Sequence, residues 1–161
     1  MRYFMDAEFN GFGGELISIA LVPNDDILPA FYEAIICERP TIWVQENVQP
    51  FLEKQPLDRE QVSDRFFKYL HNDECPVIVA DWPEDIAHAA RLLILGPGRM
   101  QPIRRIRFEL IDAAVVGPYV SSIKRHNALR DAEALRATVL AYEERLHWAS
   151  FDRVPYHPAA Y

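Results

Sequence analysis

Residues 2–9, RYFMDAEF, and residues 15–22, ELISIALV, decide the fold of this chain. The first stretch alternates as a β-strand does, and three glycines between residues 11 and 14 separate it from the second. Two such runs joined by a glycine-rich segment predict a β-hairpin. Residues 28–37 are a third strand candidate, so the chain is expected to open as an antiparallel meander.

Helical and strand patterns alternate after this opening. Asp58 with Gln61 resembles a capping box at a helix start, and Pro83 suits the first turn of a second helix. The predicted elements are, in order, a helix over residues 58–70, a strand over 76–80, a helix from 83 to the Gly-Pro-Gly at 96–98, a strand over 103–111 and a helix over 128–146. Residues 38–56 hold several turn signals and receive no assignment.

An antiparallel start followed by strands that alternate with helices predicts an α/β fold, with a mixed sheet flanked by helices. The 161 residues suffice for one domain, expected over residues 1–150, with an irregular tail over 151–161. The last helix is expected to bury four side chains, those of Leu135, Val139, Tyr142 and Leu146.

The chain is acidic, with 17 Lys and Arg against 24 Asp and Glu, a net charge of −7 and a pI of about 5.2. This balance argues against non-specific attraction to nucleic acid or anionic membranes, which a basic surface normally provides. Cys37 and Cys75 are too few for a disulfide framework, so a reducing, cytoplasmic location is expected. Neither a signal peptide nor a membrane-spanning stretch is expected.

Two carboxylates stand close together in the first predicted strand. Asp6 and Glu8 are two residues apart, so their side chains point to the same face. Like charges are costly to bury side by side, so the pair indicates either a solvated sheet face or a cation site. Acidic residues are depleted in central strands, which favours the cation site.

Two further segments place acids at the starts of helices. In residues 126–131, HNALRD, His126 is expected on the loop before the last helix and Asp131 in its first turns. An exposed loop histidine and a carboxylate favoured by the helix dipole are the plain alternative. In residues 80–85, ADWPED, Asp81 with Glu84 fits a capping box. Asp85 lies near the carboxyl end of a strand, where ligand-binding groups gather in such sheets.

Taken together, these segments resemble the three motifs of the DEDDh exonucleases of the ribonuclease H-like superfamily. The motif segments are MDAEF at 5–9, VIVADWPED at 77–85 and HNALRDA at 126–132. The opening and the small size are most similar to the compact branch that includes ribonuclease AS. The resemblance implies a ribonuclease H-like fold over nearly the whole chain.

The resemblance also implies roles for individual residues. It assigns the ligands of two divalent cations, Mg²⁺ or Mn²⁺, to four carboxylates, Asp6, Glu8, Asp85 and Asp131. His126 would be the general base, a task that suits an ordinary pKa near 6.5. Glu84 stands where the family usually has an aromatic residue, which leaves open whether Asp85 or Asp81 binds metal. Oxygen ligands suit these cations and two-metal phosphodiester hydrolysis.

The implied activity is 3′–5′ exonuclease cleavage of single-stranded nucleic acid with a free 3′ end, RNA favoured, releasing nucleoside 5′-monophosphates. An exodeoxyribonuclease and a non-catalytic binding module remain alternatives, and the family suggests a homodimer. Phe9 and Trp82 either stack on terminal bases or pack in the core, Asp81 holds a position often occupied by Asn, and Arg125 flanks the proposed base. Seven basic residues are candidates for gripping the strand: Arg99, Arg104, Arg105, Arg107, Lys124, Arg125 and Arg130.

Overall fold

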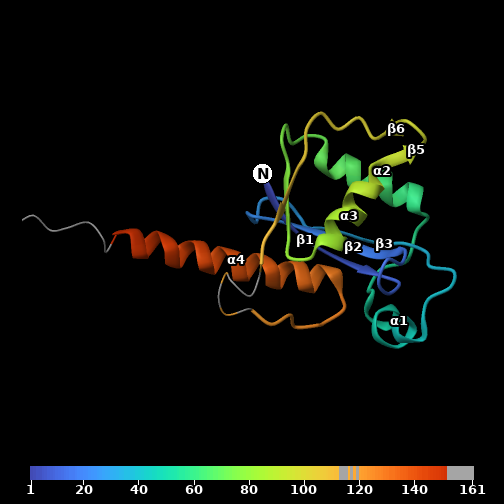
Figure 1. The fold of residues 1–161 in the computed structure, drawn as a ribbon, viewed down its shortest axis with the longest axis horizontal. Coiled ribbons are helices and arrows are strands. Elements are labelled where there is room, and N and C mark those ends of the chain that lie inside the picture. The colour runs from blue at the N-terminus through green and yellow to red at the C-terminus, as the bar shows by residue number, and fades with distance from the viewer. Residues whose placement is uncertain (113–115, 117, 119, 152–161) are drawn as a thin grey trace, which may run out of the picture.

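A five-stranded mixed sheet forms the centre of the molecule, and helices cover both of its faces (Figure 1). The computed structural model describes residues 1–112, 116, 118 and 120–151. The strands, in the spatial order β3-β2-β1-β4-β7, are Phe31–Ala34 (β3), Leu16–Pro23 (β2), Arg2–Phe9 (β1), Val77–Ala80 (β4) and Arg107–Leu110 (β7).

The strand directions agree with the sequence-based prediction. β1 pairs antiparallel with β2, and β2 pairs antiparallel with β3. β4 lies parallel to β1 on its other side, and β7 lies parallel to β4. The α/β class and the mixed sheet are therefore confirmed. The carboxyl ends of β1, β4 and β7 share one edge of this sheet.

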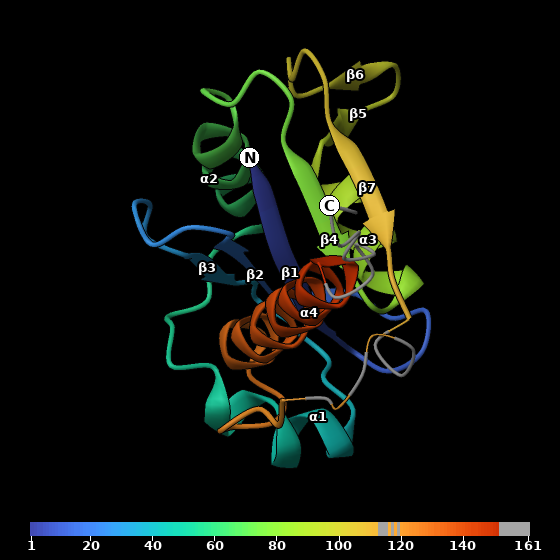
Figure 2. The ribbon, with the colours of Figure 1, turned by 90° about the vertical axis from the view of Figure 1, so that its left-hand side faces the viewer.

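Helices α2 (Arg59–Leu70) and α3 (Pro83–Leu92) lie on one face of the sheet, and α4 (Ala128–Phe151) crosses the other (Figures 1 and 2). α2 begins at the predicted capping box, where the Asp58 amide donates to the Gln61 side chain at 3.2 Å. The regular alternation of β1 is what lets it bury side chains on both faces.

The two faces of β1 belong to different cores. Every second residue of β1 joins the large core beneath α2 and α3: Tyr3, Met5 and Ala7. On the opposite face, Phe4 packs with Leu135 and Val139 of α4 and with Val79 of β4. The side chains that follow Phe4 on this face are therefore directed toward α4.

The region around the third strand differs from the prediction. β3 spans four residues rather than the expected 28–37, and its later start agrees with Pro29, which has no N–H to offer a partner strand. The unassigned stretch contains a short helix, α1 (Ile42–Asn47), and a 3₁₀ turn, η1 (Gln49–Phe51). The Thr41 side chain caps α1. A capping threonine is a sequence signal for a helix start, but the turn residues around it concealed that signal.

The segment after α3 is also different. α3 ends at Leu92, and a small hairpin follows, formed by β5 (Ile94–Gly96) and β6 (Arg99–Met100). Pro97 and Gly98 form the turn of this hairpin, and Gly98 adopts a φ of +67°. The strand expected over 103–111 is reduced to β7, since its partner β4 offers only four residues for pairing.

α4 is longer than predicted and continues to Phe151. Leu135 and Val139 are buried as expected, whereas Tyr142 is half-buried and Leu146 is 52% exposed. The C-terminal part of α4 extends beyond the sheet (Figure 1). The predicted tail from residue 152 onward lies outside the described residues. Among those described, no helix, α4 included, is long and apolar enough to cross a membrane.

Candidate functional site

The acidic pair of β1 lies on the strand face that α4 covers. Asp6 and Glu8 follow Phe4 on this face, opposite Ala20 and Ser18 of β2. The side chain of Glu8 is only 12% exposed. The open, solvated sheet face that the sequence allowed as an alternative is therefore wrong for this residue.

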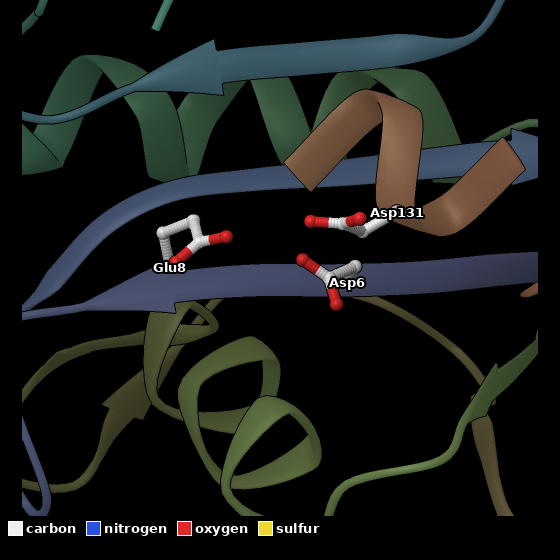
Figure 3. A group of neighbouring side chains, drawn as sticks. All are labelled: Asp6, Glu8 and Asp131. Atoms are coloured by element: carbon white, nitrogen blue, oxygen red, sulfur yellow. The ribbon is translucent and has the colours of Figure 1, made fainter. Parts of the chain in front are cut away.

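The start of α4 brings a third carboxylate to the pair. Asn127 caps the helix, since its side-chain oxygen accepts the Arg130 amide at 3.2 Å and its carbonyl accepts the Asp131 amide at 3.0 Å. Asp131 thus lies in the first turns of the helix, as predicted. Figure 3 shows its carboxylate facing those of β1, and one ligand oxygen from each of Asp6, Glu8 and Asp131 lies within 4.8 Å of the others. These three residues are called the acidic centre below.

The junction between β4 and α3 supplies two more acids near the acidic centre. Asp85, in the first turn of α3, is buried, and Asp81 lines a pocket together with Asp6 and Asp131. The predicted capping role of Asp81 is wrong. Because Pro83 is the first residue of α3, the N-cap position falls on Trp82, which makes no side-chain cap.

Glu84 makes a different contact from the predicted capping box. Its carboxylate accepts the amide of Gly13, in the hairpin turn, at 2.7 Å. This bond ties the turn between β1 and β2 to the first turn of α3. Asp81 and Asp85 both remain candidates for a further metal ligand, because Glu84 engages neither of them. Asp85 is buried, and Asp81 lies at the pocket wall.

Burial and mutual repulsion raise the pKa values of these acids. Burial raises the pKa of Asp6 well above its ordinary value, and the neighbouring charges of Asp85, Glu8, Asp131 and Asp81 raise it further. The pKa of Glu8 rises to about 8 through burial and then Asp131. That of Asp85 also rises to about 8, through burial followed by Asp81, Glu8 and Glu84. Such a group of acids is stabilised by protons or by cations.

His126 stands at the rim of the acidic centre. Its amide donates to the Asp131 carboxylate at 3.0 Å, and its Nδ1 lies 3.9 Å from the nearer Glu8 oxygen. The residue adopts a φ of +63°, in the left-handed region, on the loop before α4 where it was predicted. The imidazole is 42% exposed, so water and substrate can reach it. The edge of the Trp43 ring contacts it, with centroids 5.0 Å apart.

Two pockets open onto the acidic centre. The first, about 540 Å³ in volume, is lined by Asp6, Asp81, Ser121, Ser122, Arg125, His126 and Asp131. The predicted substrate residue Arg125 is thus exposed at the wall of the same pocket as His126.

The second pocket, about 350 Å³, is the aromatic pocket, with Glu8 and Glu84 in its lining beside four aromatic rings, Phe9, Phe12, Trp43 and Trp82. Trp82 is 54% exposed, so core packing, which the sequence left open for it, is wrong. Phe9 is half-buried and stacks on His88, with centroids 5.1 Å apart. Phe12 and Trp43 were missed by sequence reasoning. Phe12 lies between two glycines in a turn, a sequence pattern from which an exposed ring could have been predicted. The position of Trp43 depends on α1, which the sequence did not predict.

The basic residues divide between two ends of the sheet. Arg107 begins β7 opposite the first residue of β4, at the strand end remote from Asp81. Arg104 lines a pocket with residues 71–74 on the same side. Lys124 and Arg130 are each paired with an acid, Glu53 at 2.6 Å and Glu133 at 3.0 Å. Of these five residues, Arg125 is the one that lines the pocket of the acidic centre and can meet a phosphate there.

No family model matches the chain, and no curated protein matches its sequence. The chemistry of the acidic centre is the basis for the functional proposal that follows.

Proposed function

We propose that this protein is a divalent-metal-dependent 3′–5′ exonuclease of the DEDDh type, acting on single-stranded nucleic acid, with RNA favoured. The observation that carries the proposal is the convergence of Asp6, Glu8 and Asp131, with ligand oxygens within 4.8 Å of one another, beside the imidazole of His126. The mixed sheet with three antiparallel strands and later parallel ones is consistent with a ribonuclease H-like domain.

The residues present fit divalent cations of the hard type. The neighbouring charges that most raise the pKa of Asp6 are those of other carboxylates, and bound cations would relieve this repulsion. Oxygen ligands select Mg²⁺ or Mn²⁺. The acidic centre would hold one ion, and Asp85 or Asp81 would complete a second site with Asp6. Such ions stabilise the charge of a phosphodiester undergoing hydrolysis and lower the pKa of bound water.

The chain's own groups would then divide the remaining tasks. His126 is accessible, and its position is fixed by the bond from its amide to Asp131, so it can accept a proton from the attacking water. The aromatic pocket beside Glu8 offers rings on which the terminal bases can stack. Arg125 offers a cation to a backbone phosphate.

The proposal is tested with 5′-labelled RNA and DNA of the same sequence, single-stranded, in the presence of Mg²⁺ or Mn²⁺. Products should shorten stepwise from the 3′ end, and chelation should stop the reaction. Asp6→Asn should reduce the rate by more than about 100-fold. A loss of about 100-fold is the upper limit for residues that only hold a metal ligand in place, and a ligand itself should matter more. His126→Ala should reduce it by roughly 10²- to 10⁴-fold.

Matched controls separate this effect from general damage. Glu60→Gln, an exposed acid of α2, and His71→Ala, an exposed histidine after α2, should retain the parental rate. If the Asp6 and His126 variants digest the substrate as fast as the parent protein, the assignment is contradicted. An internal cleavage ladder without 3′ preference would indicate a different nuclease activity, and faster digestion of the DNA would make the protein an exodeoxyribonuclease.

A further inference from the structure

A third pocket lies away from the acidic centre, between the start of α2, the end of α3 and strands β2 and β3. Its volume is about 390 Å³, which suits a small molecule. None of its described lining residues lines either pocket beside the acidic centre. Since His88 and three arginines contribute to its wall, it is called the arginine pocket here.

His88 is the buried polar group of the arginine pocket. The residue is 3% exposed, and its Nε2 atom is buried without a hydrogen-bond partner in the described part of the chain. Buried ring nitrogens are nearly always hydrogen-bonded, so an unpaired one in a residue that lines a pocket points to a missing partner. Because the Nε2 atom itself is buried, a ligand in the pocket reaches it only after a small shift of the ring. The stacked contact with Phe9 holds the ring in place. Burial lowers the pKa of His88 and so favours the neutral imidazole, which carries one ring N–H.

The arginine pocket has three carboxylates and three guanidinium groups, so its formal charges balance. Two of the carboxylates already accept bonds within the chain: Glu15 accepts the Cys37 thiol at 3.1 Å, and Asp58 belongs to the capping box of α2. The three guanidinium groups come from Arg39, Arg59 and Arg91.

The guanidinium groups are largely uncommitted. Arg59 donates one bond to the Arg91 carbonyl. Within the described residues, neither Arg39 nor Arg91 has a carboxylate at ion-pair distance. Guanidinium groups present a fork of N–H donors that matches phosphate oxygens. A neutral imidazole N–H adds one more donor from the buried side.

We infer that the arginine pocket is a second ligand site, which binds the phosphate group of a small phosphorylated molecule through His88, Arg39 and Arg91. None of its described lining residues belongs to the acidic centre, so the inference does not rest on the proposed nuclease activity. Glu38 at the rim would disfavour a ligand that is anionic throughout and favours one with a single phosphate end.

The test is a titration of the full chain with inorganic phosphate in the presence of a chelator, followed through the ¹⁵N resonances of the histidine side chains. A matched sodium chloride titration corrects for ionic strength. The His88 resonances should shift in a saturable manner. The Arg39→Gln/Arg91→Gln variant should bind about tenfold more weakly or worse, since bonds to a charged ligand are lost. Arg104→Gln, which alters an exposed arginine in a different pocket, should bind as the parent does.

Two further arms separate this site from the proposed nuclease. Asp6→Asn should retain phosphate binding, because the acidic centre takes no part in it. A single-stranded oligonucleotide should leave the affinity for phosphate unchanged, even where bases stacked beside Phe9 shift the His88 resonances through the Phe9 ring. The inference is overturned if phosphate fails to shift His88, if the double variant binds equally well, or if the oligonucleotide displaces the phosphate. Circular dichroism confirms that each variant is folded.

Discussion

The two faces of β1 carry opposite chemistry within the same eight residues. On one face, Tyr3, Met5 and Ala7 are buried against α2 and α3. On the other, the apolar contact with α4 stops after Phe4, and Asp6 and Glu8 continue the face. The first face stabilises the fold by removing apolar surface from water. The second holds carboxylates whose raised pKa values show that, without a cation, their charge is destabilising. One strand therefore supports both the core and the candidate site, and the two faces should respond differently to substitution.

The largest expected difference comes from neighbouring substitutions on opposite faces. Met5→Ala should lower the free energy of unfolding by about 2–5 kcal/mol, because it leaves a cavity in the core. Asp6→Asn should leave that free energy unchanged or raise it in metal-free buffer, because it removes a charge repelled by its neighbours. Urea denaturation of both variants, with a chelator present, measures the two effects. A loss of stability in Asp6→Asn as large as that in Met5→Ala would contradict this contrast.

The acidic face should also be visible in the pH dependence of the metal-free protein. The folded-state pKa of Glu8 is about 8 against an ordinary 4.5, and that of Asp85 is about 8 against 3.8. Below the ordinary values both states are protonated. As the pH rises toward 8 the unfolded chain releases these protons while the folded chain retains them, so the stability present at low pH is progressively lost. The slope is at most about 1.4 kcal/mol per pH unit for each group.

Thermal unfolding across this pH range checks the sign of that slope. Saturating Mn²⁺ should reduce the loss of stability above neutral pH, since the cation replaces the protons that the acids release. Glu8→Gln should show a shallower dependence than the parent, with Glu60→Gln as the control that retains it. If the stability of the metal-free protein rises between pH 5 and pH 8, the proposed destabilisation by the acidic face is contradicted.

The smallest expected effect concerns how α4 is held over the acidic face. Asn127 is buried and caps α4, and its side-chain amide donates to the Phe51 carbonyl at 2.6 Å. Asn127→Ala should lower the free energy of unfolding by about 1 kcal/mol, the usual value for a lost cap. Asn127→Asp, which retains the capping oxygen, should lie between the parent and the alanine variant. Denaturation measures the series, with Asn72→Ala as an exposed control, and an unchanged Asn127→Ala would contradict the capping role.

Local patterns account for the elements that were predicted well. The alternation of residues 2–9 gives β1 its bounds, the Asp58–Gln61 pair marks the start of α2, and Pro83 marks the start of α3. Each of these signals depends on neighbours within a few residues. The position of His126 before α4, with Asp131 in its first turns, was predictable for the same reason.

The errors occur where distant segments decide the outcome. Asp81 fits a capping box by sequence, but Glu84 is engaged instead by Gly13 of the hairpin turn. The length of β7 follows from the four residues that its partner β4 offers for pairing. Leu146 matches the apolar pattern of α4 and is nevertheless exposed, because the sheet ends before it.

The sequence by itself determined that Asp6 and Glu8 share a face of a strand and that Asp131 stands at the start of a helix, because strand and helix periodicity are local properties. Only the tertiary structure decided that these carboxylates meet. Asp6 and Asp131 are far apart along the chain. They converge because α4 packs on the face of β1 that carries Phe4, and Asp6 is the next residue on that face. The aromatic pocket, with Phe12 and Trp43, and the arginine pocket around His88 likewise exist only once separate elements pack together.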